Sequence, residues 1–237
     1  MVIGIAGRLG SGKDTVGEVI QKLCLTNNGV EFEIKKFAGK LKTIASLVTG
    51  IPVEKFEDQE FKQKHMGLQW NMTYREFRQK LGTEGMRVGV HTNIWVNALF
   101  ADYNPVTYSD RGGWEYPNWI ITDMRFPNEL EAVEERKGIT IRVVREFYQF
   151  VDTEHEWSDR EDRQGNVLRA NATYSKEESN RVWRNSLKER AHASETALDD
   201  AKFDYEIIND GTLEDLVEKV REILIQEKII VDGIRSN

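Results

Sequence analysis

A short strand, a glycine loop and a helix are predicted in succession at the start of the chain. The apolar run 2–6 predicts a buried strand, and the apolar spacing over 16–25 predicts a helix. Between them, Gly7 and Gly12 lie five residues apart, and Lys13 follows directly. This is the G-x-x-x-x-G-K pattern of phosphate-binding loops, in the strand-to-helix context that such a loop requires. The stretch therefore indicates an α/β fold that begins with a phosphate-binding loop.

The expected chemistry of the loop follows from its backbone. Glycines allow conformations in which successive N–H groups point at one anion, and the dipole of the following helix favours negative charge there. Lys13 adds a mobile positive charge that can reach β- and γ-phosphates. The alternative is a glycine turn that binds nothing, which the agreement of loop, lysine and flanking elements disfavours. We expect the phosphates of a nucleotide to bind at Arg8, Gly10, Ser11, Gly12, Lys13, Asp14 and Thr15.

The residue after the lysine departs from the usual pattern. Ser or Thr normally stands there and contacts Mg²⁺, but this chain has Asp14, followed by Thr15. The variant G-K-x-T resembles that of nucleoside monophosphate kinases, in which the hydroxyl contacts phosphates and the metal is held largely through water. The four histidines show no metal-ligand spacing. We therefore predict no metal site built from protein ligands.

Composition limits the classes of partner. The chain has 237 residues and a net charge of −7, which disfavours polynucleotides and anionic membranes. Its one cysteine, Cys24, lies among apolar positions of the first predicted helix, so no internal disulfide can form. The sequence shows neither a signal peptide nor a membrane-spanning stretch. We expect a cytosolic protein, in the cytosol of the host cell if the chain is viral.

Strands and helices alternate along most of the chain, which implies a parallel sheet covered by helices on both faces. After the first strand, further strands are predicted at 30–37, 119–123, 140–144 and 203–209. We expect one domain over 1–237, with a long loop over 104–118.

The segment 146–190 differs from the rest, because it is charged and short of aliphatic residues. We interpret it as an inserted arm. Arg160, Arg163 and Arg169 would suit a lid over phosphates. A solvated arm, or a contact surface in a homodimer, explains the same composition at least as well.

Three groups of polar residues are candidates for a binding site. Lys40 and Lys42 stand near a helix start where parallel strands present ligands, although a solvated helix face explains them equally well. Asp123 ends a buried strand, where α/β sheets place functional groups; the alternative is a cap of the next loop.

The third group is a set of arginines. Thr73 and Glu76 form a capping box that begins a helix, which we expect to end before Gly82. On this helix Arg75 and Arg78 share one face, and Arg87 follows the glycine break. Such arginines suit a phosphate clamp, although ordinary surface arginines would give the same pattern.

In this order the motifs resemble those of phage-type deoxynucleoside monophosphate kinases, relatives of adenylate and thymidylate kinases. The matching blocks are 7–15, 37–39 with Lys42, 75–84, Trp95, 123–125 with Glu129, and 194–196. The resemblance implies a P-loop kinase core with a five-stranded parallel sheet. It also implies transfer of the γ-phosphoryl group of ATP, with Mg²⁺, to a deoxynucleoside 5′-monophosphate.

By the same resemblance the acceptor site would be lined by Lys42, Arg75, Gly82, Thr83, Trp95, Asp123, Arg125 and Glu129. Lys13, Asp123 and Arg125 would act in catalysis. The long arm departs from the short connection usual in the family. The sequence leaves open whether Asp123 serves Mg²⁺ or the acceptor.

Two other functions remain open at this point. A P-loop kinase that acts on a base or hydroxyl within DNA would share the core, but it should show a basic stripe that this acidic chain lacks outside the arm. A non-catalytic nucleotide-binding module would need the loop and would not need the arginines or Asp123.

Overall fold

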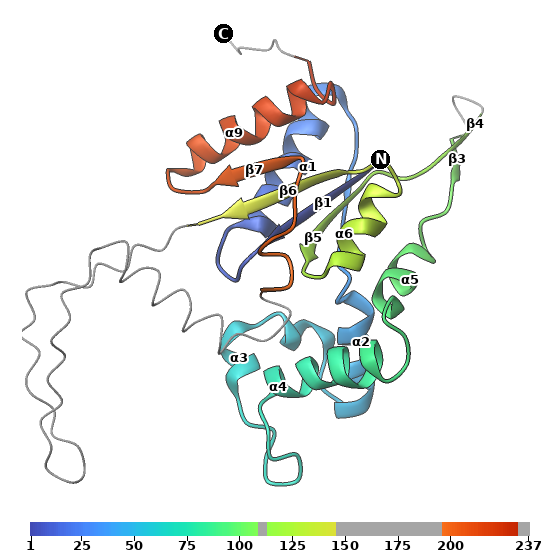
Figure 1. The fold of residues 1–237 in the computed structure, drawn as a ribbon, viewed down its shortest axis with the longest axis vertical. Helices are drawn as coiled ribbons and strands as arrows, with labels where there is room; N and C mark the ends of the chain where they lie inside the picture. The colour runs from blue at the N-terminus through green and yellow to red at the C-terminus, as the bar shows by residue number, and fades with distance from the viewer. Residues whose placement is uncertain (109–112, 146–195, 232–237) are drawn as a thin grey trace, which may run out of the picture.

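The computed structural model describes residues 1–108, 113–145 and 196–231, and it has an α/β architecture (Figure 1). Its main sheet has five strands in the order β2-β5-β1-β6-β7, and every neighbouring pair is parallel. The expected five-stranded parallel sheet is therefore confirmed. The strands are β1 (Val2–Gly7), β2 (Glu33–Lys35), β5 (Trp119–Met124), β6 (Ile139–Val144) and β7 (Tyr205–Ile208).

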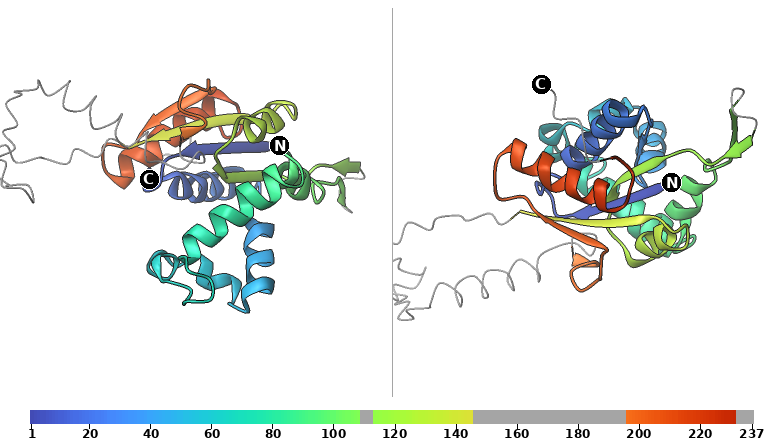
Figure 2. Two further views of the ribbon diagram at one scale, coloured as in Figure 1. Left: turned by 60° about the horizontal axis from the view of Figure 1, so that its bottom comes forward. Right: turned by 90° about the horizontal axis from the view of Figure 1, so that it is seen from above.

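Helices cover both faces of this sheet (Figure 2). On β1, Ile3 and Ile5 belong to the core cluster that contains α1 (Lys13–Asn28) and α9 (Leu213–Gln226). Val2 and Ala6, which alternate with them, belong to the cluster that contains α6 (Pro127–Glu134) and α5 (Ile94–Phe100). A strand that buries both faces needs a continuous apolar sequence, which explains the unbroken run at 2–6.

The strand register positions the candidate site. Ala6, at the end of β1, pairs with Met124 of β5, and Lys35 of β2 pairs with Ile121. The residues that follow these strands are therefore neighbours at one edge of the sheet. They are the glycine loop and the turn that begins at Lys36, and Asp123, near the end of β5, lies beside them.

A helical layer continues from this edge, and Figure 1 shows its helices grouped below the sheet. It contains α2 (Gly39–Thr49), a 3₁₀ turn η1 (Val53–Phe56), α3 (Gln59–Gln63) and α4 (Tyr74–Gln79). Its own small core is formed by Ala45, Phe56 and Phe77. The predicted capping box at the start of α4 is present, with Thr73 and Glu76 each accepting a backbone N–H of the other.

The expected helix end before Gly82 is wrong. The chain continues without a break as the π-helix η2 (Lys80–Val88). A Cβ on Gly82 would lie 2.7 Å from Leu41 Cδ2, so the glycine allows close packing against α2. The Gly82 carbonyl accepts a hydrogen bond from Trp95 Nε1 at 2.9 Å.

Two further details differ from expectation. The predicted loop 104–118 contains an antiparallel hairpin, β3 (Val106–Tyr108) and β4 (Gly113–Glu115), which projects from the rest of the described chain (Figure 1). From the sequence we also expected Asn128 to cap the helix that follows β5. Helix α6 instead begins at Pro127, and the Glu129 carboxylate accepts the N–H of Phe126.

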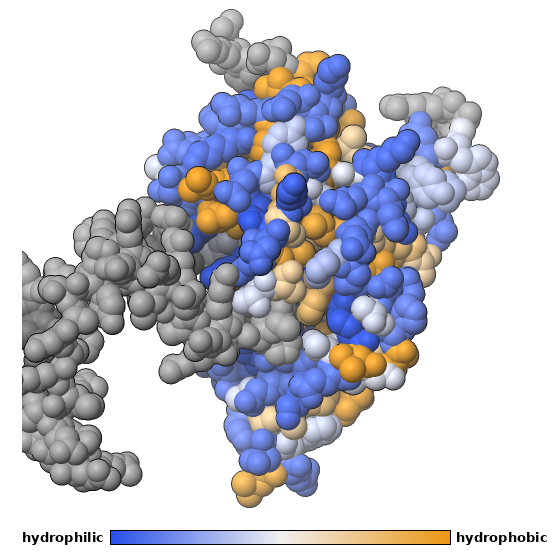
Figure 3. All heavy atoms as spheres, in the orientation of Figure 1, coloured by the Kyte–Doolittle hydropathy of each residue, from blue (hydrophilic) through white to orange (hydrophobic). Residues whose placement is uncertain are grey.

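The surface seen in Figure 3 is mostly hydrophilic, with apolar residues in small separate patches. Cys24 is buried in the core, and burial raises the pKa of its thiol to about 11. No helix in the described parts is long and apolar enough to span a bilayer. The predicted arm over 146–190, with Arg160, Arg163 and Arg169, lies outside the described residues, as does most of the block 194–196.

Candidate active site

The glycine loop has the expected position between β1 and α1. Gly10 and Gly12 adopt positive φ angles of 79° and 94°, which side-chain-bearing residues rarely adopt. Gly12 precedes α1, and no side chain caps that helix. The N-terminal end of α1 therefore presents N–H groups and the positive end of its dipole, as an anion site requires.

The loop is braced by Asn209, a residue that the sequence analysis did not single out. Asn209 follows β7, and its Nδ2 donates a hydrogen bond of 2.9 Å to the Ser11 carbonyl. A Cβ on Gly12 would lie 2.4 Å from the same nitrogen. Gly7 is equally restricted, because its Cβ would lie 2.6 Å from the Val143 carbonyl. Neighbouring strands thus fix the loop's shape.

Asp14, the residue that departs from the usual loop pattern, has two partners. Its Oδ1 accepts a hydrogen bond of 2.8 Å from Thr122 Oγ1 and lies 3.1 Å from Lys36 Nζ. Desolvation acts to raise the pKa of Asp14, but the interactions with Thr122 and Lys36 outweigh it and lower the pKa. The carboxylate is therefore ionised at neutral pH and links α1 to the ends of β5 and β2.

A cleft of about 390 Å³ adjoins the glycine loop. Ten of the residues predicted for the site line it: Lys13, Asp14, Lys42, Arg75, Gly82, Thr83, Trp95, Asp123, Arg125 and Glu129. The other predicted residues, Arg8, Gly10, Ser11, Gly12 and Thr15, are in the loop and at the start of α1, outside the cleft wall. Lys40 is not part of the wall either, and it pairs with Asp102 at 3.0 Å.

The charge of this cleft is opposite to that of the chain. Among the residues that the structure describes, eight basic side chains line it and only four acidic ones do, in a chain whose net charge is −7. Formally the wall therefore has an excess of four positive charges. A cleft with this sign attracts and concentrates small anions even when the protein as a whole is acidic.

Asp123 fixes the turn before α2. Its Oδ1 accepts the N–H of Phe37 at 2.8 Å and its Oδ2 accepts the N–H of Ala38 at 3.0 Å. Desolvation raises the pKa of Asp123, although both N–H bonds act to lower it. The carboxylate thereby positions the start of α2, the helix that presents Lys42 to the cleft.

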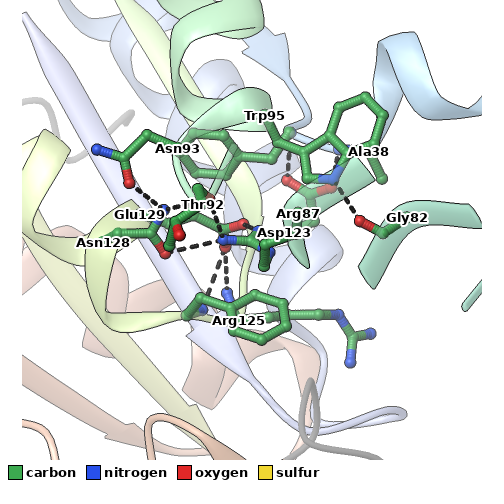
Figure 4. Close-up of polar contacts among 12 residues, drawn as sticks. Ala38, Gly82, Arg87, Thr92, Asn93, Trp95, Asp123, Arg125, Asn128 and Glu129 are labelled. Carbon is green, nitrogen blue, oxygen red and sulfur yellow. Dashed lines mark hydrogen bonds and ion pairs between the residues drawn. The ribbon is translucent and has the colours of Figure 1, made fainter. Parts of the chain in front are cut away.

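Arg87 and Glu129 form a buried ion pair at 2.6 Å (Figure 4). Arg87 Nη1 also donates to Asn128 Oδ1 at 2.9 Å and to the Thr92 carbonyl at 3.1 Å. The other Glu129 oxygen accepts the N–H of Arg125 at 2.7 Å. This network holds the β5–α6 turn, and with it the Arg125 backbone, against η2.

The surroundings of this pair shift the pKa of Glu129 and place Arg87 over an aromatic ring. Desolvation, with the nearby charge of Asp123, raises the pKa of Glu129 to about 7, although Arg87 opposes the shift. The Arg87 guanidinium also lies 3.9 Å from the centre of the Phe126 ring. Glu129 was predicted for the acceptor site, whereas Arg87 was only a member of a possible clamp.

Further cations line the cleft, and the sequence analysis did not single out two of them, Lys36 and Lys62. Lys42 pairs with Glu57, and Lys62 and Arg78 line the same cleft. Lys36 and Lys62 were missed because their surroundings contain no recognised motif. Arg78 was predicted only as a member of the possible clamp, from its spacing three residues after Arg75.

Comparisons with known proteins add little to this geometry. No model of a protein family matches the chain, and no curated protein does. Solved structures that are similar to it over nearly the whole chain include three kinases. Shikimate kinase from Aquifex aeolicus has 12% identity and a TM-score of 0.41, with 97% of this chain and 99% of that chain covered.

The other two structures give similar values. Shikimate kinase from Bacteroides thetaiotaomicron has 14% identity and a TM-score of 0.42, with coverage of 94% and 98%. Dephospho-CoA kinase from Campylobacter jejuni has 11% identity and a TM-score of 0.40, with coverage of 98% and 98%. Values this low assign no substrate to this chain.

Proposed function

We propose that the chain is a kinase that transfers the γ-phosphoryl group of ATP to the phosphate of a deoxynucleoside 5′-monophosphate. The observation that supports this most strongly is one cleft lined both by Lys13 of the glycine loop and by Arg75 and Arg125. A reaction between two phosphate groups needs such a cleft, because two polyanions must be brought into line.

The charge of the cleft agrees with this pair of substrates. A phosphate monoester is mostly a dianion at neutral pH, because its second pKa is about 6. With the two net negative charges of ATP bound to Mg²⁺, the substrates carry about four negative charges in all. The formal excess of four positive charges on the wall offsets them.

The residues present fit ATP and water-bound Mg²⁺. The uncapped start of α1 and Lys13 suit the triphosphate. Among the described residues, no three His, Cys, Asp or Glu side chains are grouped to hold a metal, and Asp14 is bonded to Thr122 and Lys36. When bound, the metal complex supplies the phosphoryl group, and phosphate oxygens and water would hold the ion, with Thr15 beside them.

The chain's own residues then bind, orient and neutralise. The acceptor oxygen is already ionised, so no strong general base is needed. This agrees with the described part of the cleft wall, which is rich in arginine and contains no histidine. Lys13 and Arg125 would neutralise the equatorial oxygens of the transferred group as the bond to ADP breaks. Asp123 keeps Phe37 and Ala38 in place at the start of α2. The choice of a deoxynucleoside acceptor rests on the sequence resemblance.

Arg75→Ala and Arg125→Ala should impair use of the acceptor far more than binding of ATP. Each would remove a charge-assisted contact to the monophosphate. The transition-state stabilisation calculated from kcat/KM for the acceptor should therefore fall by about 2–4 kcal/mol. Steady-state kinetics with each substrate varied in turn measure this. Lys40→Ala is the matched control, because Lys40 does not line the cleft. Equal damage to ATP binding would place these arginines at the donor.

A coupled assay of ADP release with a panel of nucleoside monophosphates tests the proposal as a whole. We expect ADP release to depend on one or more deoxynucleoside monophosphates. ATP binding without any turnover that depends on an acceptor would instead indicate a non-catalytic nucleotide-binding module.

A further inference from the structure

Lys62 and Arg78 lie in the cleft wall, and neither belongs to the glycine loop or to the predicted acceptor residues. Lys62 is on α3 and Arg78 is on α4, the helix that also presents Arg75. Among the residues that the structure describes, the Lys62 ammonium group makes no hydrogen bond or ion pair, and only the backbone N–H of Lys62 donates, to the Asp58 carbonyl at 3.2 Å. Arg78 donates Nη1 to the Phe56 carbonyl at 3.0 Å, while its buried Nε has no partner in the same part of the chain.

Glu57, the acidic side chain near this cluster, already has an ionic partner. Glu57 pairs with Lys42, whose side chain is 8% exposed. Desolvation acts to raise the pKa of Glu57, but Lys42 lowers it more, so Glu57 is ionised and committed to that lysine. The other two acids on this side, Asp123 and Glu129, accept backbone N–H groups or pair with Arg87.

The surroundings of Lys62 lower the pKa of its ammonium group. Burial lowers the pKa of Lys62 to about 8, and the charges of Arg78, Lys42 and Arg75 lower it further, while Glu57 opposes them. Desolvation likewise lowers the pKa of Arg78. Cations that outnumber the anions among the described residues of a cleft are typical of a site that a ligand anion completes.

We propose that Lys62 and Arg78, together with Arg75, form the subsite that binds the phosphate group of the acceptor. That this phosphate belongs to the acceptor rests on the proposed function. The preference of the subsite for a phosphate monoester dianion rests on the cluster of cations itself. Arg78 supplies a planar guanidinium whose Nε–H has no partner in the described part of the chain, and Lys62 supplies a point charge that titrates near pH 8.

The direction of the pH dependence follows from this titration. A bound dianion favours the protonated Lys62, so affinity is highest below pH 8 and falls as the free protein loses this proton. From pH 7.5 to 9.5 the phosphate is already a dianion, and Glu129, with a pKa of about 7, is mostly ionised. The dissociation constant should therefore rise at least about tenfold over this range.

Calorimetric binding of deoxyribose 5-phosphate, without ATP, tests the subsite separately from turnover. We expect the tenfold rise for the natural sequence and no such rise for Lys62→Arg, because arginine stays charged. Lys62→Met should bind at least about tenfold more weakly at pH 7.5 and show no pH dependence. An unchanged pH profile in both variants, or unchanged affinity in Lys62→Met, would overturn the proposal.

Thermal unfolding gives a second readout that a structural role would not produce. Because the lowered pKa means that the charged Lys62 is less favourable in the folded state, Lys62→Met should raise Tm at pH 7. Lys55→Met, at an exposed lysine outside the cleft wall, should change neither Tm nor binding. A fall in Tm with Lys62→Met would indicate a structural lysine and contradict the proposal.

The two proposals can fail separately. Phosphate binding with the pH profile of Lys62, but no transfer to any nucleotide, would keep the subsite and remove the proposed function. Transfer to a nucleoside monophosphate with an unchanged acceptor KM in Lys62→Met would keep the function and remove the subsite.

Discussion

Lys13→Met should reduce phosphoryl transfer by a factor on the order of 10²–10³ and leave a folded protein. Lys13 is 7% exposed at the start of α1 and lines the cleft, where its charge would act on the transferred phosphoryl group. Methionine has a similar length and fills the same space, so packing around α1 should survive.

Turnover and thermal unfolding should be measured together on this variant. Lys22→Met is the matched control, since Lys22 is an exposed lysine on the same helix. Retained turnover in Lys13→Met would remove the lysine from catalysis. Collapse of the fold would assign it a structural role instead.

Arg87→Met should destabilise the fold by about 3–5 kcal/mol, because it leaves the buried Glu129 without its ionic partner. The substitution also removes the hydrogen bonds to Asn128 and Thr92. The loss should depend on pH. The folded-state pKa of Glu129 is already raised to about 7, and it should rise further without Arg87. The variant should therefore be most stable at acid pH and lose stability as pH rises through that value.

Urea unfolding at pH 5.5 and pH 8 measures this effect. Adding Glu129→Gln to Arg87→Met should recover part of the loss at pH 8, because the buried charge is gone. Arg221→Met, which breaks only a surface pair with Glu218, should cost less than about 1 kcal/mol. If Arg87→Met costs no more than Arg221→Met at pH 8, the pair does not stabilise the fold.

Features that local sequence determines could be predicted. The glycine loop between an apolar run and a helix, the capping box at Thr73, and Asp123 at the end of a buried strand each depend on a few neighbouring residues. The parallel sheet was predictable because alternating strands and helices leave few other topologies. The structure confirms these elements and adds the brace from Asn209.

Features that depend on distant contacts were not predictable. Gly82 was expected to end a helix. It instead packs closely against Leu41 and accepts a hydrogen bond from Trp95 through its carbonyl. Arg87 meets Glu129 across 42 positions, and Asn209 meets Ser11 across 198. Lys62 has no distinguishing spacing. Only the fold shows that it lies with Arg78 in one cleft.

The fate of the γ-phosphoryl group of labelled ATP is the most direct test of the central claim. Single deoxynucleoside monophosphates, single-stranded DNA and duplex DNA should be offered separately across a series of salt concentrations. We predict label in a nucleoside diphosphate, none in DNA, and only a modest dependence on salt, because one enclosed monophosphate displaces few counterions. Label in DNA and none in a diphosphate, with activity falling steeply as salt rises, would contradict the proposed function.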